Sequence, residues 1–86
     1  MNIYKLDTPY GTRELLTEEE LQRNYTQDQI KEFKQDEETI FNVTNYNMKQ
    51  LNIARAIRNN EKEYNKLVDE YDCYLDIIDI IEMLFS

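Results

Sequence analysis

The only proline and the only glycine of this 86-residue chain lie two positions apart, in Pro9-Tyr10-Gly11. Proline fixes one backbone angle and glycine accepts a positive one, so the pair favours a tight turn. Short runs of apolar and β-prone residues flank the turn, at 3–8 and 12–16. The sequence therefore predicts a β-hairpin over residues 1–16. Because two strands alone are marginal in water, we expect the hairpin to pack on helices.

Two helix starts follow the hairpin. Thr17 precedes Glu20 by three residues, and Thr26 precedes Gln29 by three. In this capping-box pattern the threonine hydroxyl accepts from the third backbone amide, and the glutamate or glutamine side chain reaches back to the cap. The pattern predicts two short helices over residues 18–35.

The rest of the chain is read from its apolar periodicity. Residues 39–44 are short, apolar and β-branched, so a third strand is favoured there, with continued helix as the alternative. Residues 45–86 are helical in character, with a predicted break near 59–60. The sequence predicts two helices in this part, at about 46–58 and 61–85.

These elements together predict the fold class. A chain of 86 residues forms one domain at most. We expect a single domain over residues 1–86 with an α+β, mostly helical fold. Its short N-terminal hairpin, with a third strand where 39–44 pairs, packs on a bundle of about four helices.

The residues that are missing exclude several kinds of chemistry. The chain has no histidine, one glycine and one cysteine, Cys73. It therefore lacks the usual general base near neutral pH, a phosphate-binding glycine loop and a Cys/His zinc set. We predict that the protein is not an enzyme and that it uses no metal and no cofactor. Cys73 is expected to be a buried structural residue, because nearby carboxylates would make a poor nucleophile of it.

The C-terminal part carries six acidic residues and no basic residue beyond Leu67. On one continuous helix, four of these carboxylates fall within an arc of about 80°. These four residues form the predicted acidic stripe: Asp69, Asp72, Asp76 and Asp79. Like charges on one face repel, and their place near the helix C-terminus is unfavourable for the dipole. Two interpretations are open, a solvated helix face or a surface that docks on a basic partner.

Further contact residues are predicted outside the stripe. Secondary acidic contacts are expected at Glu18, Glu19, Asp36, Glu37 and Glu38. Tyr10, at the tip of the hairpin, is the predicted aromatic contact, because an exposed tyrosine offers a large contact area at a low entropy cost. An exposed turn tyrosine without a role is the alternative.

The last predicted helix is apolar around most of its circumference. Its apolar residues either close the core of the chain or form a homodimer contact through Ile77, Ile81, Leu84 and Phe85. Tyr71 and Tyr74 lie on the apolar side of the same predicted helix and are expected in the core. The homodimer interpretation leads to an alternative function, a non-enzymatic structural or assembly protein that oligomerises through its Ile-rich C-terminal helix.

Net charge restricts the choice of partner. The chain has 18 acidic and 10 basic residues, a formal net charge of −8. This charge disfavours direct binding to nucleic acid or to an anionic membrane, and it favours a basic protein partner or simply solubility.

The most apolar stretch, 74–85, contains three acidic residues, so no membrane span is predicted. The start shows no signal-peptide pattern, and many residues have A/T-rich codons. We therefore expect a cytoplasmic location in a bacterial host.

The acidic clusters, the small size and the lack of catalytic residues support one resemblance. The clusters are Glu18-Glu19-Glu20, Asp36-Glu37-Glu38 and the acids from Asp69 to Glu82. In these properties the chain resembles small phage-encoded inhibitors of host nucleic-acid enzymes, such as the anti-CRISPR proteins. The resemblance implies an inhibitor that occludes a basic, nucleic-acid-binding groove, with carboxylates in the places of phosphates.

Overall fold

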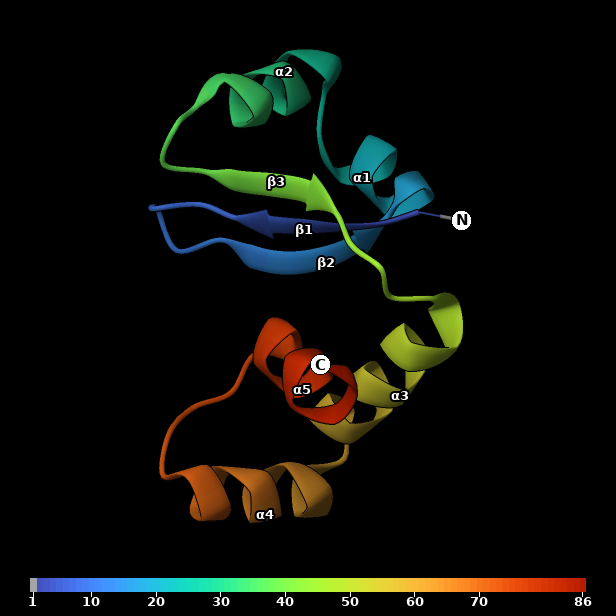
Figure 1. Cartoon of the computed structure of the whole chain (residues 1–86), viewed down its shortest axis with the longest axis vertical. Helices are drawn as coiled ribbons and strands as arrows, with labels where there is room; N and C mark the ends of the chain where they lie inside the picture. The colour runs from blue at the N-terminus through green and yellow to red at the C-terminus, as the bar shows by residue number, and fades with distance from the viewer. Residues whose placement is uncertain (1) are drawn as a thin grey trace. The chain divides into compact units, whose positions relative to one another are not determined.

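A computed structural model describes residues 2–86, and it confirms an α+β, mostly helical fold. Over this range the chain has three strands and five helices and divides into two compact units (Figure 1). Met1–Asn47 contains β1 (Ile3–Asp7), β2 (Arg13–Thr17), α1 (Glu18–Asn24), α2 (Gln27–Gln35) and β3 (Ile40–Val43). Met48–Ser86 contains α3 (Met48–Asn59), α4 (Glu61–Tyr71) and α5 (Ile77–Phe85). The grouping of both units into one domain stays a prediction.

The first unit is built on an antiparallel sheet with strand order β2-β1-β3. The predicted hairpin is confirmed, with Tyr4 of β1 opposite Leu16 of β2. The favoured third strand is also confirmed, because Phe41 of β3 lies opposite Leu6 of β1. This pairing makes β1 the central strand. The pairing places Leu6 of β1, Leu16 of β2 and Phe41 of β3 on one face of the sheet.

Helices α1 and α2 cover that face (Figure 1). Both predicted capping boxes are present. The Thr17 hydroxyl accepts from the Glu20 amide at 3.2 Å, and the Thr26 hydroxyl accepts from the Gln29 amide at 3.2 Å. The core cluster between sheet and helices consists of Leu6, Leu16, Leu21 and Ile30, with Tyr4, Tyr25, Phe33 and Phe41 packed against it.

Tyr25 connects this core to the sheet through its hydroxyl. The Tyr25 hydroxyl donates to Glu14 Oε2 at 2.7 Å. Burial, followed by the hydrogen bond and the negative charge of Glu14, raises the pKa of Tyr25 from 10.0 to about 12. The folded state therefore keeps the phenol proton at a pH where the unfolded chain has lost it.

This shift predicts a loss of stability in alkali. Because the pKa is raised in the folded state, the stabilisation is complete below about pH 10 and is lost as the pH rises from 10 to 12. We expect the unfolding free energy of the wild type to fall more steeply than that of Tyr25→Phe between about pH 9 and about pH 11.5. Urea titrations at several pH values measure both slopes. Parallel slopes would contradict the role of Tyr25, because the other tyrosines and the lysines are common to both proteins.

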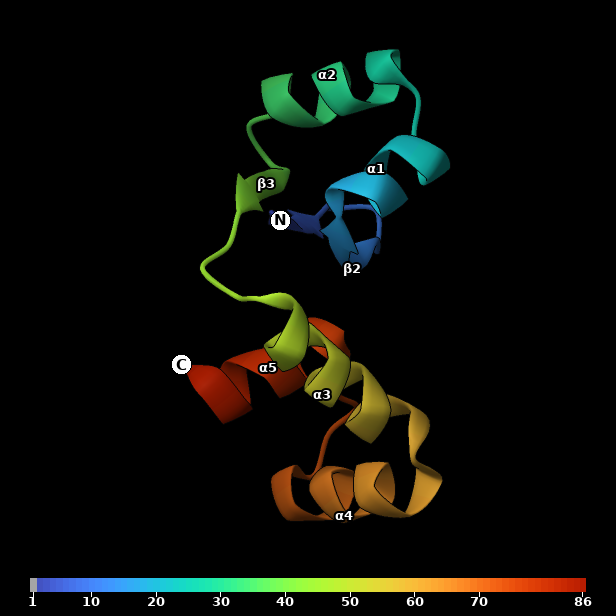
Figure 2. The same ribbon diagram turned by 90° about the vertical axis from the view of Figure 1, so that its right-hand side faces the viewer.

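The second unit consists of helices only, and they can be followed in Figure 2. Helix α3 packs against both α4 and α5, and its Leu51 and Ala54 are fully buried. The predicted break near 59–60 is confirmed. Asn60 caps α4, and its side chain accepts from the Glu63 amide at 3.2 Å.

The prediction of one helix over 61–85 is wrong. Helix α4 ends at Tyr71, and Asp72 adopts a left-handed conformation with a φ of +55°. Helix α5 begins after Asp76, whose carboxylate accepts from the Asp79 amide at 3.0 Å. Apolar and aromatic residues recur every seven positions through this break, at Tyr64, Tyr71, Ile78 and Phe85, so periodicity alone could not reveal it.

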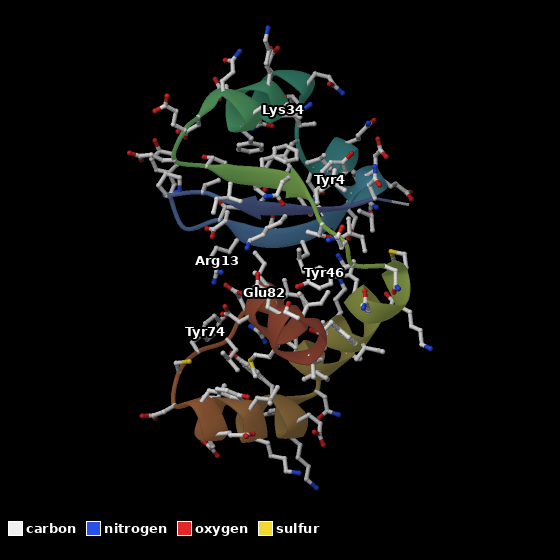
Figure 3. The ribbon with its side chains drawn as sticks, in the orientation of Figure 1. Tyr4, Arg13, Lys34, Tyr46, Tyr74 and Glu82 are labelled. Carbon is white, nitrogen blue, oxygen red and sulfur yellow. The ribbon has the colours of Figure 1, made fainter. Side chains whose placement is uncertain are left out.

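The loop between α4 and α5 is held by a tyrosine of α4. The buried Tyr64 hydroxyl donates to the Leu75 carbonyl at 2.8 Å and accepts from the Leu75 amide at 3.1 Å. The guanidinium carbon of Arg58 lies 4.4 Å from the centroid of the Tyr64 ring, and the guanidinium donates to the Tyr74 hydroxyl at 2.9 Å. Tyr74 lies on this loop (Figure 3) and is 70% exposed. Tyr71 is also exposed, so the prediction that Tyr71 and Tyr74 are core residues is wrong.

Candidate functional site

The predicted acidic stripe does not form on one helix face. Asp69 lies in the last turn of α4 and Asp72 follows that helix, whereas Asp76 and Asp79 lie at the start of α5. Asp76 and Asp79 form a capping box, in which Asp79 Oδ2 accepts from the Asp76 amide at 3.1 Å. Their negative charges therefore meet the favourable end of a helix dipole, which is the opposite of the sequence-based expectation.

The other half of the stripe keeps its unfavourable place. Asp69, Glu70 and Asp72 are exposed at the C-terminal end of α4, and the last turn of that helix has no basic residue. We call these three residues the α4-end acids. Within residues 2–86, their carboxylates form no ion pair. Carboxylates at a helix C-terminus add to the negative end of the dipole, so this end of α4 attracts cations.

A similar cluster follows α2 in the first unit. Glu37 and Glu38 are exposed, and Asp36 is half-buried. The Asp36 carboxylate accepts from the Glu38 amide and from the Thr39 hydroxyl, both at 3.0 Å, which orders the loop that leads into β3. We call Asp36, Glu37 and Glu38 the α2-end acids. Glu18 and Glu19 are exposed as well, but they lie in the first turn of α1, where the helix dipole already favours them.

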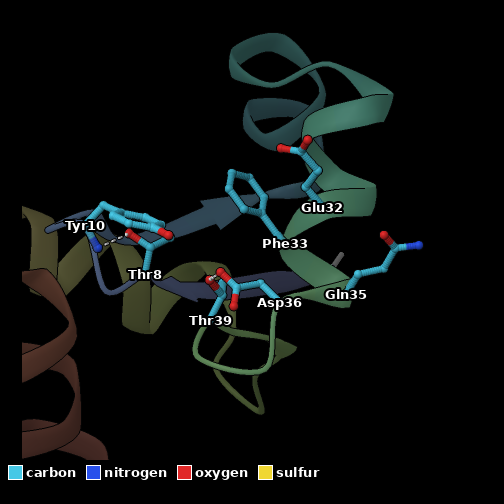
Figure 4. Close-up of a pocket in the computed structure, with 7 residues that line it drawn as sticks. All are labelled: Thr8, Tyr10, Glu32, Phe33, Gln35, Asp36 and Thr39. Atoms are coloured by element: carbon cyan, nitrogen blue, oxygen red, sulfur yellow. Dashed lines mark hydrogen bonds between the residues drawn. The ribbon is translucent and has the colours of Figure 1, made fainter.

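The predicted contact Tyr10 is 86% exposed at the hairpin tip. The sheet places this tip beside the loop after α2, because Asp7 at the end of β1 is opposite Ile40 at the start of β3. A cavity of about 480 Å³ lies between the tip and the end of α2 (Figure 4). Its lining residues are Thr8, Tyr10, Glu32, Phe33, Gln35, Asp36 and Thr39. We call this cavity the tip pocket.

The structure fixes both sides of the tip pocket. Phe33 packs edge to face against Tyr25, with ring centroids 5.1 Å apart. On the other side, the Thr8 hydroxyl accepts from the Tyr10 amide at 3.3 Å and from the Thr12 amide at 3.2 Å. Gly11 supplies the positive φ of +96° that closes the turn.

The sequence identified part of this pocket. Tyr10 and Asp36 were predicted as separate contacts, and the structure brings them to one cavity. Sequence reasoning missed the other lining residues, which are Thr8, Glu32, Phe33, Gln35 and Thr39. The strand signal at 39–44 was the clue, because pairing of β3 with β1 carries the end of α2 toward the hairpin tip.

A second cavity, of about 400 Å³, lies in the second unit and is lined by Cys73, Leu75, Asp79, Glu82 and Met83. Cys73 is an exposed free cysteine, so the prediction of a buried structural thiol is wrong. The reason is the break after α4, which places Cys73 in a loop instead of on a helix face.

The proposed homodimer residues do not form one exposed face. Ile81 is 0% exposed, Ile77 and Phe85 are half-buried, and Leu84 is 43% exposed. Burial of α5 isoleucines within this chain favours the interpretation that they close its own core.

In the part of the chain from 2 to 86, no group of three or more His, Cys, Asp or Glu side chains could hold a metal ion. Within the same range, no helix has the length and apolarity needed to cross a membrane. The chain matches no protein-family model, no curated protein and no solved structure.

Proposed function

We propose that this protein is a non-enzymatic inhibitor that docks its acidic surface on a basic, nucleic-acid-binding groove of another protein. Carboxylates take the places of phosphates and exclude the real ligand. The observation that supports this proposal is the placing of exposed acids at the C-terminal ends of α2 and α4. At both ends the negative charge lies where the helix itself gains least from it.

The distribution of charge supports the same proposal. Residues 1–47 contain ten acidic and five basic residues, and residues 48–86 contain eight and five. Each unit is therefore negative by itself, at −5 and −3. A basic groove would gain attraction from either unit, and the attraction would be screened by salt.

Capture from a bacterial lysate tests the proposal. The tagged chain is expected to retain a basic nucleic-acid-binding protein at about 50 mM salt and to release it at about 500 mM. Added chain must then displace nucleic acid from the purified partner in a binding assay. Capture that resists salt, or a partner that keeps its nucleic acid, would contradict the proposal.

Variants of the α4-end acids locate the docking surface. Asp69→Asn with Asp72→Asn is expected to weaken partner binding by about 2- to 30-fold, because an exposed ion pair contributes roughly 0.2–1 kcal/mol. Asparagine tolerates the left-handed conformation of residue 72, so the helix end is kept. Isothermal titration calorimetry against the purified partner measures the change in Kd.

The matched control is Glu61→Gln with Glu63→Gln. These exposed acids lie at the opposite end of α4 and change the net charge by the same amount. Their replacement is expected to weaken binding much less. Equal losses for the two double variants would show that net charge matters and the position of the α4-end acids does not.

A further inference from the structure

The tip pocket combines aromatic rings and carboxylates around one cavity. Figure 4 shows Phe33 projecting from α2 toward the hairpin tip that carries Thr8 and Tyr10. Asp36 and Thr39 line the same cavity. Its acidic lining residues are Glu32 and Asp36, and none of its lining residues is basic. The volume of about 480 Å³ lies in the range of cavities that hold a small ligand or a side chain.

Electrostatics selects the charge of the ligand. The pocket lies at the C-terminal end of α2, so the negative end of the helix dipole adds to the two carboxylates. Glu37 and Glu38 follow Asp36 directly in the chain. A phosphate or a carboxylate ligand would be repelled by all of these groups, whereas a cation would be attracted.

The aromatic residues select the kind of cation. A guanidinium is planar and weakly hydrated, so it can stack on a ring while its N–H groups donate to a carboxylate. An ammonium is a compact and strongly hydrated charge that gains less from two rings. The second unit contains the stacking half of this chemistry, because the Arg58 guanidinium lies 4.4 and 5.5 Å from the centroids of the Tyr64 and Tyr74 rings.

We infer that the tip pocket binds a single arginine side chain of the partner, with Tyr10 and Phe33 as aromatic walls and Glu32 and Asp36 as acceptors. This inference rests on the proposed function, because it names the group through which a basic partner is recognised. The 86% exposure of Tyr10 leaves its ring accessible to such a side chain.

Titration with short peptides tests the inference. The probes are acetyl-Gly-Arg-Gly-amide, its lysine counterpart and its citrulline counterpart, which has nearly the shape of arginine without the charge. In ¹H–¹⁵N spectra, the arginine peptide is expected to shift resonances of Tyr10, Phe33 and Asp36 and to saturate with a Kd on the order of 1 mM. The lysine peptide is expected to bind at least about 3-fold more weakly, and the citrulline peptide is expected not to saturate below about 20 mM.

A double variant with a matched control ties the binding to this pocket. Tyr10→Ala with Glu32→Gln replaces two exposed residues and is expected to weaken arginine-peptide binding by about tenfold or more. The control, Tyr71→Ala with Glu61→Gln, removes an exposed tyrosine and an exposed acid from α4, and it is expected to leave arginine-peptide binding unchanged. Unchanged amide dispersion verifies that both variants fold.

Three results would overturn the inference: equal binding of the arginine and lysine peptides, shifts that map outside the pocket, or equal losses in both double variants. Its failure can be distinguished from failure of the proposed function. Salt-sensitive capture and displacement of nucleic acid without arginine-peptide binding would remove only the pocket. Arginine-peptide binding without displacement of nucleic acid from a captured partner would remove only the inhibitor.

Discussion

Replacement of Leu6 with alanine is expected to lower the free energy of unfolding by about 2–5 kcal/mol. Leu6 is 0% exposed on the central strand, and it packs in one cluster with Leu16, Leu21 and Ile30. Removing its side chain leaves a cavity between the sheet and both covering helices. Because small domains have a total stability of only about 5–15 kcal/mol, this loss is a large fraction of the whole.

Urea denaturation followed by circular dichroism measures this loss. The midpoint is expected to fall while the slope with denaturant stays the same. The matched control is Val43→Ala on β3, whose side chain is 52% exposed, and we expect a loss of less than about 1 kcal/mol. A cost for Leu6→Ala as small as that of the control would show that the cluster is not the core of the first unit.

Tyr64→Phe is expected to cost about 1–3 kcal/mol, although it removes a single oxygen atom. The Tyr64 hydroxyl bonds both the amide and the carbonyl of Leu75 in a buried place. Without the hydroxyl, both backbone groups lose their partner, and unpaired buried groups are costly. We also expect the hydrogen exchange of the Leu75 amide to accelerate, because the loop after α4 loses its anchor.

Tyr74→Phe is the control for this prediction. It also removes one tyrosine hydroxyl, but that hydroxyl accepts from Arg58 at an exposed position. We expect a change within about 0.5 kcal/mol and unaltered exchange at Leu75. If both variants cost the same, the double hydrogen bond to Leu75 does not stabilise the second unit.

Local patterns were predictable because the interactions behind them join residues three apart. The capping boxes of α1 and α2 and the Asn60 cap are of this kind. The turn at Gly11 was predictable for a related reason, because a positive φ depends on a single residue. For these elements, a short window of sequence contains both partners of the interaction.

The loop from 72 to 76 shows where such reasoning failed. Asp76 and Asp79 have the spacing of a capping box, but each also fitted the polar face of a continued helix. The choice between the two was made by Tyr64, eleven residues before Leu75, whose hydroxyl pairs the backbone of the non-helical loop. A contact of that separation leaves no periodic signal.

The hairpin, the short capped helices, the acidic character and the lack of histidine chemistry could be read from residue types and near neighbours, because each depends on nothing more distant in the chain. Which acids lie together depends on the assembled fold. It assigned Asp76 and Asp79 to the cap of a helix and brought Tyr10, Phe33 and Asp36 to one cavity. The physical reason is that strand pairing and side-chain packing join residues far apart in the chain, and their free energy depends on the assembled fold.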